Sequence, residues 1–63
     1  MEKEELYAIL FEFNERVKET RKMINEFDES KLNRLERSSL KILELEMSLF
    51  ENRFDNFNED WNS

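Results

Sequence analysis

The chain contains neither glycine nor proline among its 63 residues, so it lacks the two residue types that most often interrupt a helix. Glu, Lys, Arg, Leu and Met are common in the sequence, and all of them are good helix formers. We therefore expect an all-α fold. The spacing of the apolar residues then decides how many helices form and which sides of them pack.

The first half of the chain carries a heptad seam, in which successive members are alternately four and three residues apart. Its members are Leu6, Leu10, Phe13, Val17, Thr20, Ile24 and Phe27. This spacing is typical of a helix that packs along one side. Glu2, Glu4 and Glu5 precede the seam, where negative charge suits the helix dipole. The pattern predicts a first helix over about residues 2–27.

The register of this seam stops after Phe27, and a second seam follows. Its members are Leu40, Leu43, Met47, Phe50, Phe54, Phe57 and Trp61, and beside them runs a parallel stripe of Leu35, Ser38, Ile42, Leu45 and Leu49. They predict a second helix over about residues 30–58, with 59–63 frayed. Because Asp28 and Ser30 are favourable N-caps, we expect the turn of a helical hairpin there. One continuous helix with a register shift is the alternative.

A chain of this length forms one domain, residues 1–63, and buries only about 60% of its unfolded surface. It has no cysteine or histidine, so neither disulfides nor a usual zinc site can add stability. Two hairpins packed face to face would cover both stripes of the second helix. We therefore predict a homodimeric four-helix bundle. Its expected core is Leu6, Leu10, Phe13, Val17, Ile24, Phe27, Leu35, Leu40, Ile42, Leu43, Met47, Leu49, Phe50, Phe54 and Phe57.

Charge is distributed unevenly along the chain, whose formal net charge is −6. Residues 16–41 carry eight basic and five acidic side chains, a net charge of +3. The remaining residues carry two basic and eleven acidic side chains, a net charge of −9. In a hairpin the middle of the chain forms the turn end and the two termini form the other end. Two such rods are expected to lie antiparallel.

The composition argues against an enzyme. Without histidine there is no group that ordinarily exchanges protons near neutral pH or activates a serine nucleophile. Without glycine there is no phosphate-binding loop of the common kind. We expect no catalytic, metal-binding or cofactor-binding residues.

One stripe of the first helix combines aromatic and basic side chains: Tyr7, Phe11, Asn14, Lys18, Arg21 and Lys22. We expect this stripe to point away from the first seam. Three interpretations are open. Tyr7 and Phe11 widen the apolar surface, or the stripe contacts a protein partner, or its rings and bases bind RNA.

The expected architecture resembles the Rop family, small helical-hairpin dimers of colicin-type plasmids that bind paired RNA loops. The resemblance covers the chain length, the central turn and the heptad seams, and it implies an RNA-binding hairpin dimer. The Rop core alternates small and large residues in layers, whereas the present core is rich in phenylalanine. The excess of acidic residues also opposes binding to nucleic acid.

The preferred functional prediction is a small, non-enzymatic regulatory or adaptor protein that acts as a homodimer through protein–protein contacts. A Rop-like RNA-binding dimer is the alternative. An acidic protein that imitates nucleic acid is a third, less favoured one. No apolar run is long enough to cross a membrane, and residues 1–5 do not resemble a signal peptide. We therefore expect a cytoplasmic protein.

Overall fold

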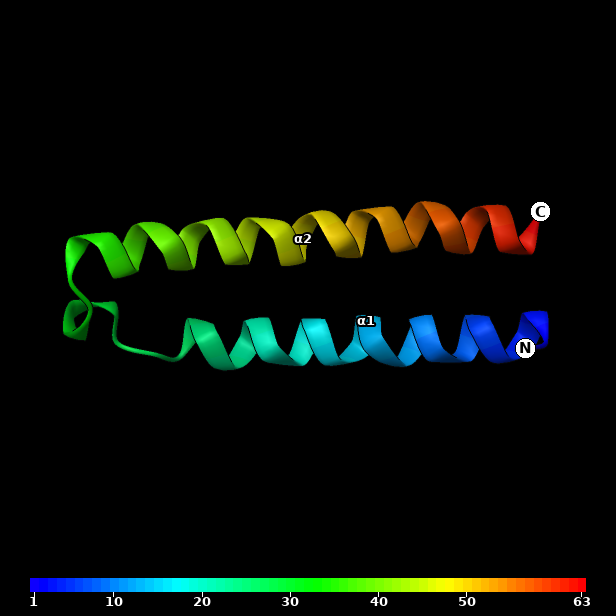
Figure 1. The fold of residues 1–63 in the computed structure, drawn as a ribbon, viewed down its shortest axis with the longest axis horizontal. Coiled ribbons are helices and arrows are strands. Elements are labelled where there is room, and N and C mark those ends of the chain that lie inside the picture. Colours follow the sequence, from blue (N-terminus) through cyan, green and yellow to red (C-terminus); the bar gives the residue numbers. More distant parts are fainter.

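A computed structural model describes residues 1–63 as two long antiparallel helices joined by a short connection (Figure 1). Helix α1 spans Lys3–Asn25, a 3-10 turn η1 spans Glu29–Lys31, and helix α2 spans Arg34–Asn62. The molecule is a rod with extents of 44 × 18 × 15 Å. Both termini lie at one end, here called the open end, and the connection forms the turn end (Figure 1). The predicted all-α hairpin is confirmed.

Helix α1 begins and ends without a side-chain cap. Glu4 and Glu5 lie in its first turn and Lys22 in its last, so both ends carry charges that complement the helix dipole. Beyond Asn25, the amides of Glu26 and Phe27 donate to carbonyls three residues earlier. This tightening of the last turn is a common way to satisfy the final carbonyls of a helix. The helix therefore ends just before the predicted boundary at residue 27.

The connection is longer than the predicted three-residue turn because Asp28 caps η1, and a later residue caps helix α2. The carboxylate of Asp28 accepts hydrogen bonds from the amide and the hydroxyl of Ser30, at 3.0 and 2.7 Å, and thereby caps η1. Helix α2 is capped instead by Asn33, whose side chain accepts from the amide of Glu36 at 2.8 Å. The Glu36 carboxylate accepts in return from the Asn33 amide at 2.9 Å, which completes a capping box. The second helix thus begins at residue 34 and not at residue 30.

The line of contact between the helices contains alternate members of the two predicted seams. From α1 these are Leu10, Val17 and Ile24, and from α2 they are Leu40, Met47, Phe54 and Trp61. Val17 is 8% exposed and Phe54 is 6% exposed, and they are the only buried apolar residues. Two helices alone therefore give a very thin core.

Aromatic side chains fill the space between the helices at the open end. Tyr7 of α1 stacks on Trp61 of α2 with a centroid separation of 4.9 Å, and Phe57 lies 5.6 Å from Trp61. The ammonium group of Lys3 lies 4.7 Å from the Trp61 ring centroid, a cation–π contact. These contacts hold the C-terminal turn, and α2 continues to Asn62 instead of fraying after residue 58.

Candidate interaction surface

One flank of the hairpin is an exposed apolar surface, here called the apolar face. It consists of the exposed residues Leu6, Phe13, Phe27 and Leu43 and the half-buried residues Phe50 and Phe57, which together with Thr20 are the remaining members of the two seams. Phe13 and Phe50 meet edge to face across the two helices, with centroids 4.9 Å apart. Yet Phe13 remains 51% exposed. Because seven-residue spacing keeps side chains on one side of a helix, the face continues along both helices.

At the turn end the apolar face becomes a groove with a volume of about 700 Å³. The groove is lined by Thr20, Met23, Ile24, Phe27, Leu32, Leu35, Glu36, Ser39, Leu40 and Leu43. Seven of these ten residues are hydrophobic. The hairpin by itself does not fill the space between its helices near the turn.

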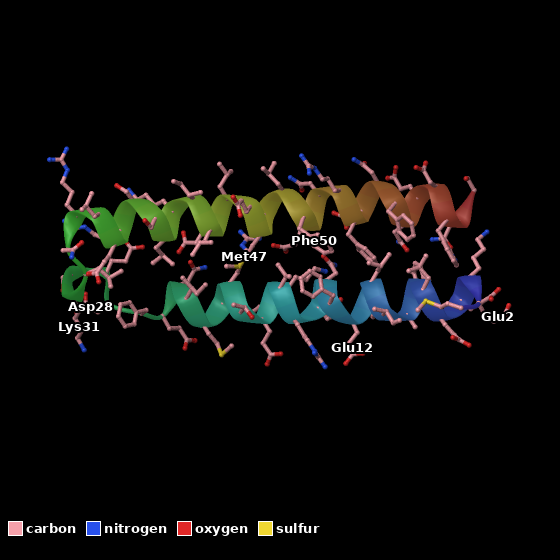
Figure 2. All side chains as sticks on the ribbon, viewed as in Figure 1. Glu2, Glu12, Asp28, Lys31, Met47 and Phe50 are labelled. Carbon is pink, nitrogen blue, oxygen red and sulfur yellow. The ribbon has the colours of Figure 1, made fainter.

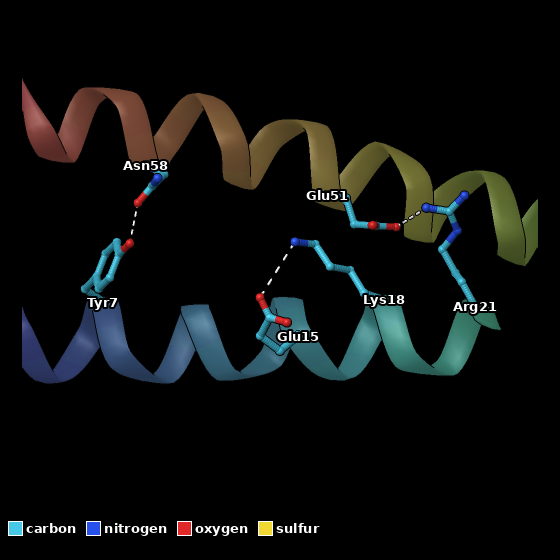
Figure 3. A network of polar contacts seen from close by, with 6 residues as sticks. All are labelled: Tyr7, Glu15, Lys18, Arg21, Glu51 and Asn58. Carbon is cyan, nitrogen blue, oxygen red and sulfur yellow. Dashed lines mark hydrogen bonds and ion pairs between the residues drawn. The ribbon is translucent and has the colours of Figure 1, made fainter. Parts of the chain in front are cut away.

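The opposite flank, here called the polar flank, contains ion pairs (Figure 3). Arg21 of α1 donates to the Glu51 carboxylate of α2, and the ammonium nitrogen of Lys18 lies 3.7 Å from a carboxylate oxygen of Glu15. A shallow hollow on this side is lined by Glu15, Lys18, Glu19, Arg21, Lys22, Asn25 and Glu51, with no hydrophobic residue among them. Its three basic and three acidic side chains balance in charge, so the hollow has no net attraction for a polyanion.

The structure places half of the predicted partner or RNA stripe inside the hairpin. The Tyr7 hydroxyl donates to the Asn58 side chain (Figure 3), Asn14 is 2% exposed, and Arg21 pairs with Glu51. These three residues face α2, whereas the sequence pattern placed them on an outward side. The other three members, Phe11, Lys18 and Lys22, are exposed.

The cause is a second heptad series that interleaves with the first. Tyr7, Leu10, Asn14, Val17, Arg21 and Ile24 also follow alternating steps of three and four. This series faces α2. Tyr7 and Arg21 bond to side chains of α2, and Asn14 is buried without a donor for its side-chain oxygen. Its polar members made the series look like a solvent-facing side. The spacing alone was the signal that could have identified it.

Asn14 is the most deeply buried residue of the molecule, and its side-chain oxygen has no hydrogen-bond donor. An amide oxygen removed from water without a partner destabilises a fold by about 1–3 kcal/mol. The helix contact is therefore weakened at its centre.

A second apolar stripe, here called the outer stripe, runs along the side of α2 away from α1. It consists of Ile42, Leu45 and Leu49, which are all exposed, whereas Leu35, the first member of the predicted stripe, lines the groove at the turn end. At about 100° per residue, Leu45 and Leu49 lie about 160° around the helix from Met47, which faces α1. A hairpin stacked on the apolar face would therefore leave most of this stripe exposed, although the sequence pattern predicts that a dimer covers both stripes of α2.

No three His, Cys, Asp or Glu side chains are grouped so that they could hold a metal ion. Neither helix has an uncharged apolar stretch of the length that a bilayer requires. No protein-family model, curated protein or solved structure matches this chain.

Proposed function

We propose that the protein is a homodimeric four-helix bundle that acts as a small regulatory or adaptor module through protein–protein contacts, without enzymatic activity. The observation that carries this proposal is the apolar face. It extends along both helices and includes large side chains such as Phe13, Phe27 and Leu43, all of them about half exposed. Contiguous apolar patches of this kind mark interaction sites in soluble proteins.

The dimensions of the hairpin suit this role. Its long and intermediate extents, 44 and 18 Å, outline a side of roughly 800 Å², which is about the area that each partner buries in a stable protein interface. Only Val17 and Phe54 are buried apolar residues in the single hairpin. If a second copy packed against the apolar face, the seam members that are exposed in the single hairpin would be buried in the core of the dimer.

The outer stripe supports the adaptor part of the proposal. It remains accessible when the apolar face is covered, so each protomer of the dimer presents an apolar helix side to another protein. The RNA-binding alternative has less support. Tyr7 and Arg21 are engaged within the hairpin, and the polar flank has balanced charge.

The dimer can be tested with a matched pair of charge substitutions followed by light scattering after size exclusion. Phe13→Glu places a carboxylate on the apolar face and is expected to abolish the dimer. Phe11→Glu makes the same change to a residue of similar exposure on α1 outside the apolar face, and is expected to leave the dimer intact. Equal masses for the two variants would contradict the assignment of the interface.

The adaptor role can be tested with Leu45→Glu in the outer stripe. The wild type is expected to capture partner proteins in a pull-down, and this variant is expected to remain dimeric and to lose that capture. Asn25→Glu is a suitable control, because Asn25 is an exposed residue of α1 on the polar flank, away from the outer stripe. Capture that is unchanged by Leu45→Glu would refute the assignment of the outer stripe.

A further inference from the structure

The two ends of the hairpin differ in how completely the space between the helices is filled. At the open end, Tyr7, Phe57 and Trp61 stack within 4.9–6.4 Å of one another, and Phe54 is buried beside them. At the turn end, the space between the helices is the open groove of about 700 Å³. One end of the apolar face is thus filled with large rings and the other end is hollow.

The same two ends differ in charge. The half of the hairpin nearer the turn, residues 16–49, carries eight basic and seven acidic side chains, a net charge of +1, whereas the half nearer the termini carries two basic and nine acidic side chains, a net charge of −7. In Figure 2, Lys31 lies at the turn end and Glu2 at the open end, on opposite ends of the rod. The groove therefore lies at the end of the rod with a small positive charge, and the aromatic rings lie at the strongly negative end.

We propose that the groove at the turn end is occupied by the open end of a second copy of this chain, so that the two hairpins of the dimer lie antiparallel. This inference rests on the proposed homodimer and specifies its geometry. Leu6 and Phe57 of one copy would enter the groove between Phe27 and Leu43 of the other. By symmetry, each copy fills the groove of its partner.

The parallel arrangement has two physical disadvantages. It would place two open grooves against each other and two aromatic ends against each other, so that one end of the bundle would contain a void and the other would be overpacked. Voids and overpacking both destabilise a core. It would also bring together the two halves that each carry a net charge of −7, where like charges repel.

A twofold symmetry axis of the dimer can pass through the middle of the apolar face. Phe13 lies near the midpoint of α1. Phe50 lies near the midpoint of α2 (Figure 2). In an antiparallel dimer the Phe13–Phe50 pair of one hairpin would contact the same pair of the other hairpin. An isologous contact of this kind, in which the same residues face each other, is the usual form of a twofold interface.

Distances between spin labels test the orientation. The chain has no cysteine, so Lys31→Cys and Glu2→Cys each provide one labelling position in an otherwise unmodified protein. Both positions are exposed and lie off the apolar face. Lys31 is preferred to Asp28 because the Asp28 carboxylate caps η1. Double electron–electron resonance is then measured on each labelled dimer and on an equal mixture of the two.

In the antiparallel dimer, Lys31–Lys31 and Glu2–Glu2 distances are expected to be close to the 44 Å length of the rod. The mixture is expected to add a distance near 20 Å, comparable to the 18 Å width of one hairpin. Short distances in both single-label samples would mean that the turns meet, and would overturn the orientation while leaving the dimer in place. A monomeric mass for the labelled proteins in light scattering would overturn the proposed dimer itself.

Discussion

Replacing Asn14 by leucine is expected to stabilise the protein. Asn14 is 2% exposed, and its side-chain oxygen has no donor within the hairpin. Leucine has the same number of side-chain heavy atoms and the same branching, so it fits the site without a large change of volume. The substitution removes an unsatisfied polar group that costs about 1–3 kcal/mol, and it adds apolar surface to the core.

We therefore expect Asn14→Leu to raise the free energy of unfolding by about 2 kcal/mol, which corresponds to an increase in Tm of about 8–16 °C in a domain of this size. Thermal and urea unfolding followed by circular dichroism measure the change. All samples need equal protein concentration, because dimer formation contributes to the measured stability.

Asn52→Leu is the matched control. It makes the same substitution within a helix at an exposed position, and therefore reports what leucine adds without burial between the two helices. If Asn14→Leu stabilises the protein no more than Asn52→Leu, the Asn14 side chain makes hydrogen bonds in solution that its place in the hairpin does not explain. That result would contradict the placement of the Asn14 oxygen as a buried atom without a hydrogen-bond donor.

Three further perturbations test other parts of the fold. Phe54→Ala is expected to cost about 3–5 kcal/mol in urea unfolding, because Phe54 is buried between the helices, and a loss below 1 kcal/mol would contradict that placement. Asn33→Ala removes the cap of α2 and is expected to cost about 1 kcal/mol in the same assay; no loss would mean that the capping box is not formed. Hydrogen bonds from Ser30 lower the pKa of Asp28 below 3.8, so the stability they add is complete above pH 3.8 and is lost as the pH falls through the lowered pKa. The Ser30 amide signal in NMR should accordingly titrate below pH 3.8, and a midpoint above that value would contradict the assignment.

The heptad seams were sufficient to predict two helices and an antiparallel hairpin, because apolar spacing reports which side of a helix is buried. They did not settle the rotation of α1. The series that contains Leu6 and Phe13 and the series that contains Tyr7 and Asn14 share Leu10, Val17 and Ile24. Which of the two faces α2 depends on contacts such as Tyr7 with Trp61, between residues more than fifty positions apart.

The boundaries of α2 were mispredicted for local and long-range reasons. The Asn33–Glu36 pair is a recognisable capping-box pattern, but Asp28 and Ser30 offered competing caps directly after the first seam. At the other end, the polar residues around Trp61 suggested fraying. The stacking of Trp61 on Tyr7, and the position of Lys3 over the same ring, cannot be inferred from the local sequence.

The proposed function depends on burial of the apolar face between two copies of the chain. Sedimentation equilibrium of the unmodified protein at micromolar concentration measures whether the two copies associate. A single folded species with twice the 7.8 kDa mass of the chain is expected. A helical, cooperatively unfolding species of 7.8 kDa at the same concentration would contradict the proposal, because the apolar face would then be stable in water without a partner.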